Sequence, residues 1–158
     1  MKPGVTVLAI ATSLLAGTFH AGRASRAQGT SGVAVVGDTM PQSLTGKSGD
    51  AARGRDISFS RDRGNCIVCH AMLAPDERLH GDVGPSLEGV AGRLTEGQMR
   101  LRLVDGRRLN PSSLMPSYYR ADGLKRVATA YAGKTVLTAE EIEDVLAYLM
   151  TLRPDEKR

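Results

Sequence analysis

The most regular apolar pattern in the chain lies near its C-terminus. The apolar side chains recur at the three- and four-residue spacing of a single helix face. Thr138 is followed three residues later by Glu141, which is the pattern of a capping box, and further acids occupy the early turns, where the helix dipole favours them. We therefore predict an amphipathic helix that begins after Thr138 and ends before Pro154. Its apolar positions are Ile142, Val145, Leu146, Leu149 and Leu152.

Two shorter helices are predicted upstream. Asp50 suits the N-cap of a helix over residues 51–59. Thr95 and Gln98 form a second capping box, which predicts a helix as far as about Val104 that stops at Asp105-Gly106.

A further helix is predicted over residues 124–131, because Leu124, Val127, Ala128 and Tyr131 have helical spacing ahead of Gly133. Long loops, rich in Gly and Pro, occupy residues 71–94 and 107–121. No strand pattern competes, so the predicted fold class is all-α, with helices held apart by loops.

The N-terminus resembles a secretory signal peptide. Lys2 precedes an uncharged apolar run from Val5 to Phe19, which is shorter than the roughly 20 residues that span a bilayer. Small side chains at Ser25 and Ala27 predict cleavage after Ala27; a cut after Ala21 or Ala24 and an uncleaved anchor are the alternatives. We expect export to the periplasm and no membrane span after cleavage.

The remaining chain divides into an arm and a domain. Residues 28–48 are rich in Gly, Ser and Thr, and we interpret them as an extended arm that lies over the domain of residues 49–158. Because the arm carries an apolar patch at Val33–Val36, it is reasonable to expect that it becomes ordered only in a complex.

Charge and composition change the picture in two ways. The chain has a net charge of +4, but residues 1–27 contain three basic side chains and no acid, so the predicted mature chain is close to neutral. That balance argues against nucleic-acid binding. Only 4% of the residues are aromatic, so long loops would surround a thin core unless a non-protein group completes it.

Cys66-Ile67-Val68-Cys69-His70 is the attachment pattern of a c-type haem. On a helical turn these spacings put both thiols and the imidazole on one face. The thiols of Cys66 and Cys69 can then add to the haem vinyl groups, and His70 can ligate the iron. Three alternatives are weaker: zinc lacks a further cysteine, a thioredoxin-like pair lacks a βαβ setting, and a disulfide would leave His70 unexplained.

The second axial ligand decides what such a haem can do, because Met raises the reduction potential and an open site permits ligand chemistry. Met115 is favoured, because it lies in a loop and Pro116 restricts the backbone after it. His80, Met40 and an open site remain as alternatives. Met72 lies too near His70, whereas Met99 and Met150 fall in predicted helices.

Two further features bear on the haem. The Pro85 carbonyl, next to Gly84, is a plausible acceptor for the second N–H of His70. The densest basic cluster could pair with haem propionates or with an acidic partner, or it could be a solvated face. Its members are Arg100, Arg102, Arg107 and Arg108.

Several stretches resemble the SoxX family of mono-haem cytochrome subunits. They include Gly49-Asp50 with Arg53-Gly54-Arg55, Arg63 through His70, Gly81 through Leu87, Asn110-Pro111, and Gly133-Lys134 with residues 137–149. Met115-Pro116-Ser117-Tyr118-Tyr119 and the arm before Gly49 are the most particular to that family. The resemblance implies a cytochrome c type fold whose first and last helices pack together near Gly54. It also implies one covalently bound haem c, held by Cys66 and Cys69 and ligated by His70 and Met115.

The resemblance also implies a role. The partner would be a SoxA-like cytochrome subunit in a heterodimer, acting on a SoxYZ-type carrier, with a soluble cytochrome c as electron acceptor. The chain would be the electron-transfer subunit of an L-cysteine S-thiosulfotransferase (SoxAX), which attaches thiosulfate oxidatively to a carrier cysteine, and would carry no catalytic residue itself. The alternatives are a free-standing electron shuttle and a haem sensor or small peroxidase with an open distal site.

Overall fold

The computed structural model describes residues 33–72 and 79–154. The predicted signal peptide, residues 1–27, lies outside the described residues. No helix in the described part of the chain is long and apolar enough to cross a membrane.

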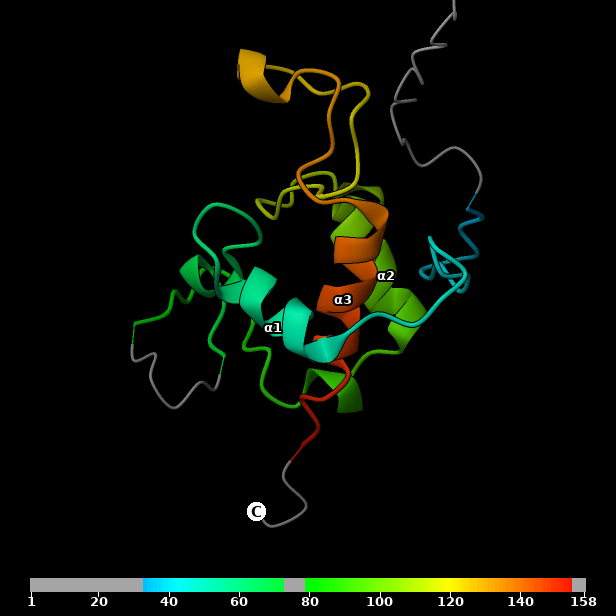
Figure 1. The fold of residues 1–158 in the computed structure, drawn as a ribbon, viewed down its shortest axis with the longest axis vertical. Coiled ribbons are helices and arrows are strands. Elements are labelled where there is room, and N and C mark those ends of the chain that lie inside the picture. The colour runs from blue at the N-terminus through cyan, green and yellow to red at the C-terminus, as the bar shows by residue number, and fades with distance from the viewer. Residues whose placement is uncertain (1–32, 73–78, 155–158) are drawn as a thin grey trace, which may run out of the picture.

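Three helices make up the body of the molecule (Figure 1): α1 (Ala51–Phe59), α2 (Glu96–Asp105) and α3 (Ala139–Leu149). Short 3₁₀ turns separate them. Within residues 33–72 and 79–154 the only β pairing is an isolated bridge between Val36 and Thr39, so the all-α prediction is confirmed. The turns are Cys66–Val68, Val90–Gly92, Gly106–Arg108 and Thr129–Tyr131.

The predicted helix starts are confirmed. The Asp50 carboxylate accepts a hydrogen bond from the Arg53 N–H and caps α1. Thr95 caps α2 and Thr138 caps α3, each in a capping box. In each box the threonine hydroxyl accepts from the backbone N–H three residues later, and the side chain of that later residue accepts from the threonine N–H. Local sequence thus determines where all three helices start.

The contact between α1 and α3 depends on Gly54. A Cβ atom at this position would lie 1.8 Å from the Asp144 carbonyl oxygen, so only glycine allows the two backbones to approach this closely. An ion pair fixes the same crossing, because Asp144 accepts from the Arg53 Nε at 2.9 Å and from the Asp50 N–H at 2.7 Å. The expected packing of the first and last helices near Gly54 is confirmed.

The described part of the arm contacts α2 and α3 within this one chain. Met40 is 1% exposed, and its N–H donates to the Gly97 carbonyl at 2.9 Å. The Leu44 N–H donates to Glu143 at 2.9 Å. A single chain thus supplies hydrogen-bond partners for residues 40–44.

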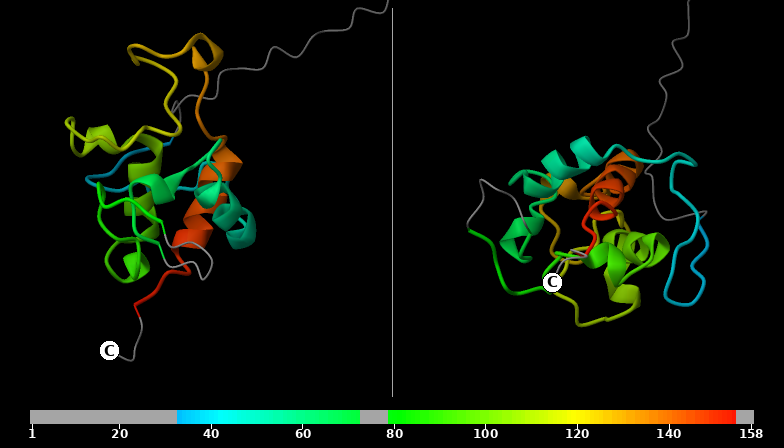
Figure 2. Two further views of the ribbon diagram at one scale, coloured as in Figure 1. Left: turned by 90° about the vertical axis from the view of Figure 1, so that its left-hand side faces the viewer. Right: turned by 90° about the horizontal axis from the view of Figure 1, so that it is seen from below.

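The predicted helix over residues 124–131 is wrong. This stretch contains only the 3₁₀ turn Thr129–Tyr131, and it extends away from the helical body (Figures 1 and 2). A helix this short is not stable in water unless its apolar face is buried. Here Leu124, Val127 and Tyr131 are all exposed, so no packing stabilises one.

Candidate haem site

The two cysteines and His70 are brought together by a single turn of chain. Asn65, in the left-handed conformation with φ 47°, ends the preceding segment and starts the 3₁₀ turn Cys66–Val68. The N–H groups of Cys69 and His70 both donate to the Cys66 carbonyl. Cys66 is buried, Cys69 is half-buried, and both are free thiols rather than a disulfide.

Burial raises the pKa of the Cys66 thiol to about 11, although a hydrogen bond with Ser58 works in the opposite direction. The thiol of the haem-free chain is therefore protonated at neutral pH. Cys66 would hold a haem through a thioether bond.

The imidazole of His70 is held in a defined orientation. Its Nδ1 lies 2.7 Å from the Pro85 carbonyl oxygen, which can only accept, so Nδ1–H donates there. In the neutral imidazole this leaves the lone pair on Nε2. The Gly84 N–H donates to the Cys69 carbonyl at 2.8 Å and brings this loop against the ring. A Cβ atom on Gly84 would lie 2.3 Å from His70 Cε1, so a larger residue would displace the imidazole.

Met115 lies on a second loop. Its side chain is half-buried against the apolar cluster that also contains Cys66. The loop is anchored just beyond it, because the Tyr118 N–H donates to the Leu103 carbonyl at 3.0 Å and the Tyr118 carbonyl accepts from Leu137 at 2.9 Å. These bonds attach the loop to the end of α2 and to the segment before α3.

Tyr118 also connects this loop to the cysteine segment. Its hydroxyl donates to the Gly64 carbonyl at 2.7 Å, two residues before Cys66, and burial raises the pKa of that hydroxyl. The ring is buried. The sequence pattern does not reveal this role of Tyr118, because its partner Gly64 lies 54 residues away.

The alternative ligands have other surroundings. His80 is exposed, with its Nδ1 3.3 Å from the Gly81 carbonyl oxygen. Met40 is enclosed in the apolar core beside α2, where its own carbonyl accepts a hydrogen bond from Arg100. The donor set offered by the Cys66–His70 segment and the Met115 loop is two thiols, an imidazole and a thioether, which is the set that fits a haem c.

The basic cluster does not form one surface, contrary to expectation. Arg100 is 2% exposed, and its guanidinium is bonded to Glu143 at 2.9 Å, to Glu96 and to the Met40 carbonyl. Its pKa is raised: burial would lower it, but the two carboxylates outweigh that effect. Arg100 therefore cannot meet a propionate or a partner protein.

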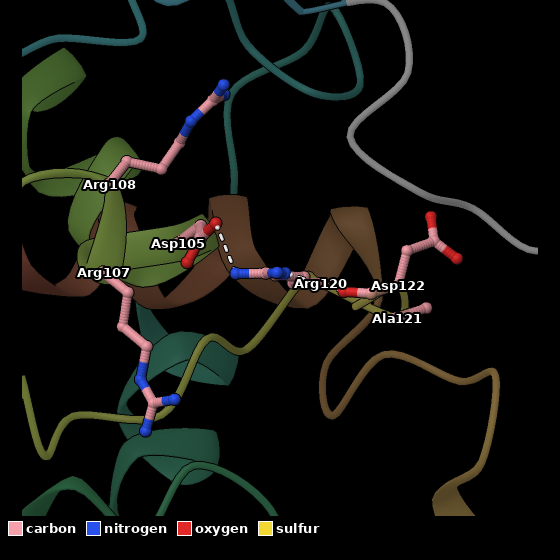
Figure 3. Close-up of a pocket in the computed structure, with 6 residues that line it drawn as sticks. All are labelled: Asp105, Arg107, Arg108, Arg120, Ala121 and Asp122. Carbon is pink, nitrogen blue, oxygen red and sulfur yellow. Dashed lines mark hydrogen bonds and ion pairs between the residues drawn. The ribbon is translucent and has the colours of Figure 1, made fainter. Parts of the chain in front are cut away.

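Arg102 donates to the Gln98 carbonyl at 2.8 Å, whereas Arg107 and Arg108 line a polar pocket at the end of α2 (Figure 3). Arg107 and Arg108 are exposed and extend in opposite directions, whereas Arg120 pairs with Asp105 at 3.4 Å across the pocket. Asp105 also accepts from the Ser117 hydroxyl at 2.6 Å. The pocket therefore carries charges of both signs.

Comparison with solved structures identifies a clear relative. A chain of the crystal structure of SoxXA from P. pantotrophus is 34% identical with a TM-score of 0.70, and the alignment covers 77% of this chain and 94% of that one. The c-type cytochrome SorU from Sinorhizobium meliloti is 26% identical with a TM-score of 0.40, covering 65% of this chain and 90% of its own. Ferric cytochrome c-550 from Paracoccus versutus is 20% identical with a TM-score of 0.39, covering 68% and 100%. No family model matches, and no curated protein matches.

The helical fold and the Cys66–His70 site define a c-type cytochrome, the class that carries haem c and transfers electrons. At this identity and coverage, the chain belongs to the SoxX family.

Proposed function

We propose that this chain is the mono-haem electron-transfer subunit of a periplasmic, thiosulfate-oxidising complex of the SoxAX type. In this proposal it forms a heterodimer with a SoxA-like cytochrome subunit. Its haem accepts electrons released when thiosulfate is attached oxidatively to a cysteine of a SoxYZ-type carrier, and passes them to a soluble cytochrome c. Two arguments support it: family membership, and the contact of His70 Nδ1 with the Pro85 carbonyl at 2.7 Å, which prepares Nε2 to bind iron.

A bound haem would supply a reversible one-electron iron couple. Cys66 and Cys69 would hold it through thioether bonds, and His70 Nε2 would ligate the iron on one side. We propose Met115 as the ligand on the other side, because its thioether raises the reduction potential to the range that suits electron transfer. The Pro85 carbonyl would maintain the imidazole orientation and its basicity.

This chain contributes no catalytic residue in the proposal. The sulfur chemistry would take place on the partner, and the two loops of this chain would keep the iron six-coordinate, so that it exchanges electrons rather than binding small molecules. A haem sensor or peroxidase would require an open position in place of Met115.

One spectrum tests the ligand set. The chain is produced with haem attached and with its native N-terminus, and the ferric protein is examined for the weak far-red absorption of a methionine–iron bond. We expect the band in the wild type and in the control Leu114→Ala, whose side chain is 82% exposed. We expect it to be lost in Met115→Ala. Rapid binding of carbon monoxide by the unmodified ferrous protein would instead indicate a sensor or peroxidase.

A second experiment tests the role. The holoprotein is co-expressed with a SoxA-type cytochrome subunit, purified, and mixed with a SoxYZ-type carrier and thiosulfate. We expect a stable heterodimer whose haem is reduced when thiosulfate is added. A protein that stays monomeric and is not reduced under these conditions would be a free-standing shuttle or have another function.

A further inference from the structure

One segment of the chain is not packed on the body of the protein. Residues 122–136, which we call the projecting loop, extend beyond the helices between the Met115 loop and α3 (Figures 1 and 2). Every residue from 122 to 134 is exposed. Local bonds shape its tip, where the Tyr131 N–H donates to Ala128 at 2.8 Å and the Lys134 ammonium to Ala130 at 3.1 Å.

The projecting loop exposes large apolar side chains. Tyr131 is 54% exposed and Val136 is 44% exposed, and Leu124 and Val127 are more than one third exposed. Scattered exposed apolar residues are normal, but a gathered set on one segment is typical of an interaction site.

The backbone conformation and the charge of the projecting loop also favour an interaction site. Arg126 has a φ of 58°, a conformation that is uncommon and costs energy for a bulky residue. Arg126 and Lys125 are both exposed. With Lys134, they give the projecting loop three basic side chains against one acidic side chain, Asp122. An acidic surface would therefore complement it.

We propose that the projecting loop is the docking element for the SoxA-like cytochrome subunit. Its apolar side chains would bury in a groove on that subunit, and Lys125 and Arg126 would pair with carboxylates around the groove. The inference rests on the proposed function and names the surface that holds the proposed partner. Apolar burial supplies the affinity in such an arrangement, whereas the charges accelerate and orient the encounter.

The test compares variants of the full-length holoprotein for binding to the purified SoxA-like subunit. Val127→Ser with Tyr131→Ser removes two exposed apolar side chains, so the fold should be unaffected. We expect the dissociation constant to rise at least tenfold. Leu109→Ser is the control, because Leu109 and Val127 are both 37% exposed and Leu109 lies outside the loop. Lys125→Glu with Arg126→Glu should also weaken binding and reduce its dependence on salt.

The outcomes separate the two proposals. Equal binding by the wild type and the serine variant would overturn the docking proposal and leave the heterodimer intact. No binding by the wild type would overturn the heterodimer and the docking proposal with it. Self-association of the wild type that the serine variant abolishes would mean that the loop binds a second copy of this chain, and would also overturn the proposal.

Hydrogen exchange tests the docking proposal without a variant. In the free holoprotein, the amides of residues 122–130, which are exposed, should exchange fast. Upon addition of the SoxA-like subunit, their exchange should slow at least tenfold. Unchanged exchange in a complex that has formed would contradict the proposal directly.

Discussion

The Tyr118 hydroxyl donates a hydrogen bond of 2.7 Å to the Gly64 carbonyl, and thereby joins the loop of Met115 to the segment that begins at Cys66. The bond is buried, so water does not compete for either partner. The two loops proposed to supply the iron ligands are thus attached to one another within the protein itself. Tyr118 is a positioning residue in this arrangement.

Replacing Tyr118 by Phe should weaken ligation by Met115 without unfolding the protein. The lost hydrogen bond is worth about 1 kcal/mol, which corresponds to roughly a fivefold change in an equilibrium. We expect imidazole, which competes with methionine for ferric iron, to bind about fivefold more tightly. The measurement is an imidazole titration of the ferric holoprotein, followed by loss of the far-red band.

Tyr119→Phe is the matched control for this experiment. Tyr119 is also buried, and its hydroxyl has no hydrogen-bond partner among the described residues. Equal imidazole affinity in the two variants would show that the Tyr118 hydroxyl does not position Met115.

Gly84→Ala should disturb the His70 side of the site. The new Cβ would lie 2.3 Å from His70 Cε1, so the imidazole must move away from the Pro85 carbonyl. We expect a lower yield of six-coordinate haem and a loss of stability of about 1–3 kcal/mol, as overpacking usually costs. Optical spectra and thermal unfolding of the holoprotein measure both effects.

Gly106→Ala serves as the control for that variant, because a Cβ there has no atom within 4 Å. If Gly84→Ala had the same spectrum and melting temperature as Gly106→Ala, the loop would be able to accommodate the added methyl group. Gly84 would then not be required to position the His70 imidazole.

Local signals made much of the fold predictable. The capping boxes at Thr95 and Thr138 lie within four residues of sequence, and the Cys66–His70 motif lies within five. Partners that are distant in sequence were not predictable: Tyr118 bonds to a residue 54 positions away and Arg100 to one 43 positions away. The helix over residues 124–131 failed for a related reason. Spacing reveals an apolar face, but it does not tell whether the rest of the chain covers it.

The ion pair of Asp144 should make stability depend on pH. Burial alone would raise the pKa of Asp144, but the hydrogen bonds from Arg53 and from the Asp50 N–H outweigh it, and the net pKa is lowered. A depressed pKa in the folded state adds stability above the unfolded value of about 3.9, and that stability is lost as the pH falls below it.

Asp144→Asn removes this contribution. We expect the variant to be less stable than the wild type by about 1–2 kcal/mol at pH 7, since the bonds involve a charged group. The difference should shrink as the pH falls from about 3.9 towards 3, because the carboxyl group then takes up a proton in the unfolded chain more readily than in the folded one. Urea unfolding at both pH values checks this, with Asp56→Asn as the control because Asp56 is 79% exposed. A difference that stays constant between the two pH values would contradict the assignment.

Arg100 should hold the arm on the domain, because its guanidinium bonds to Glu143 and to the Met40 carbonyl while Glu143 also accepts from the Leu44 N–H. Arg100→Met leaves Glu143 as a buried charge without this partner, which should cost about 3–5 kcal/mol and loosen the arm. Trypsin should then cut faster after the exposed Lys47. Arg102→Met, which removes a half-buried arginine from the same helix, should change both the stability and the rate of cleavage little.

A double variant tests the ion pair itself. Because an apolar pair of similar volume needs no compensating charge, Arg100→Met with Glu143→Met should recover stability relative to Arg100→Met alone. A double variant that is no more stable than Arg100→Met would contradict the unpaired Glu143 charge as the cause, and would mean that the hydrogen bonds to the Met40 carbonyl and from the Leu44 N–H hold the arm.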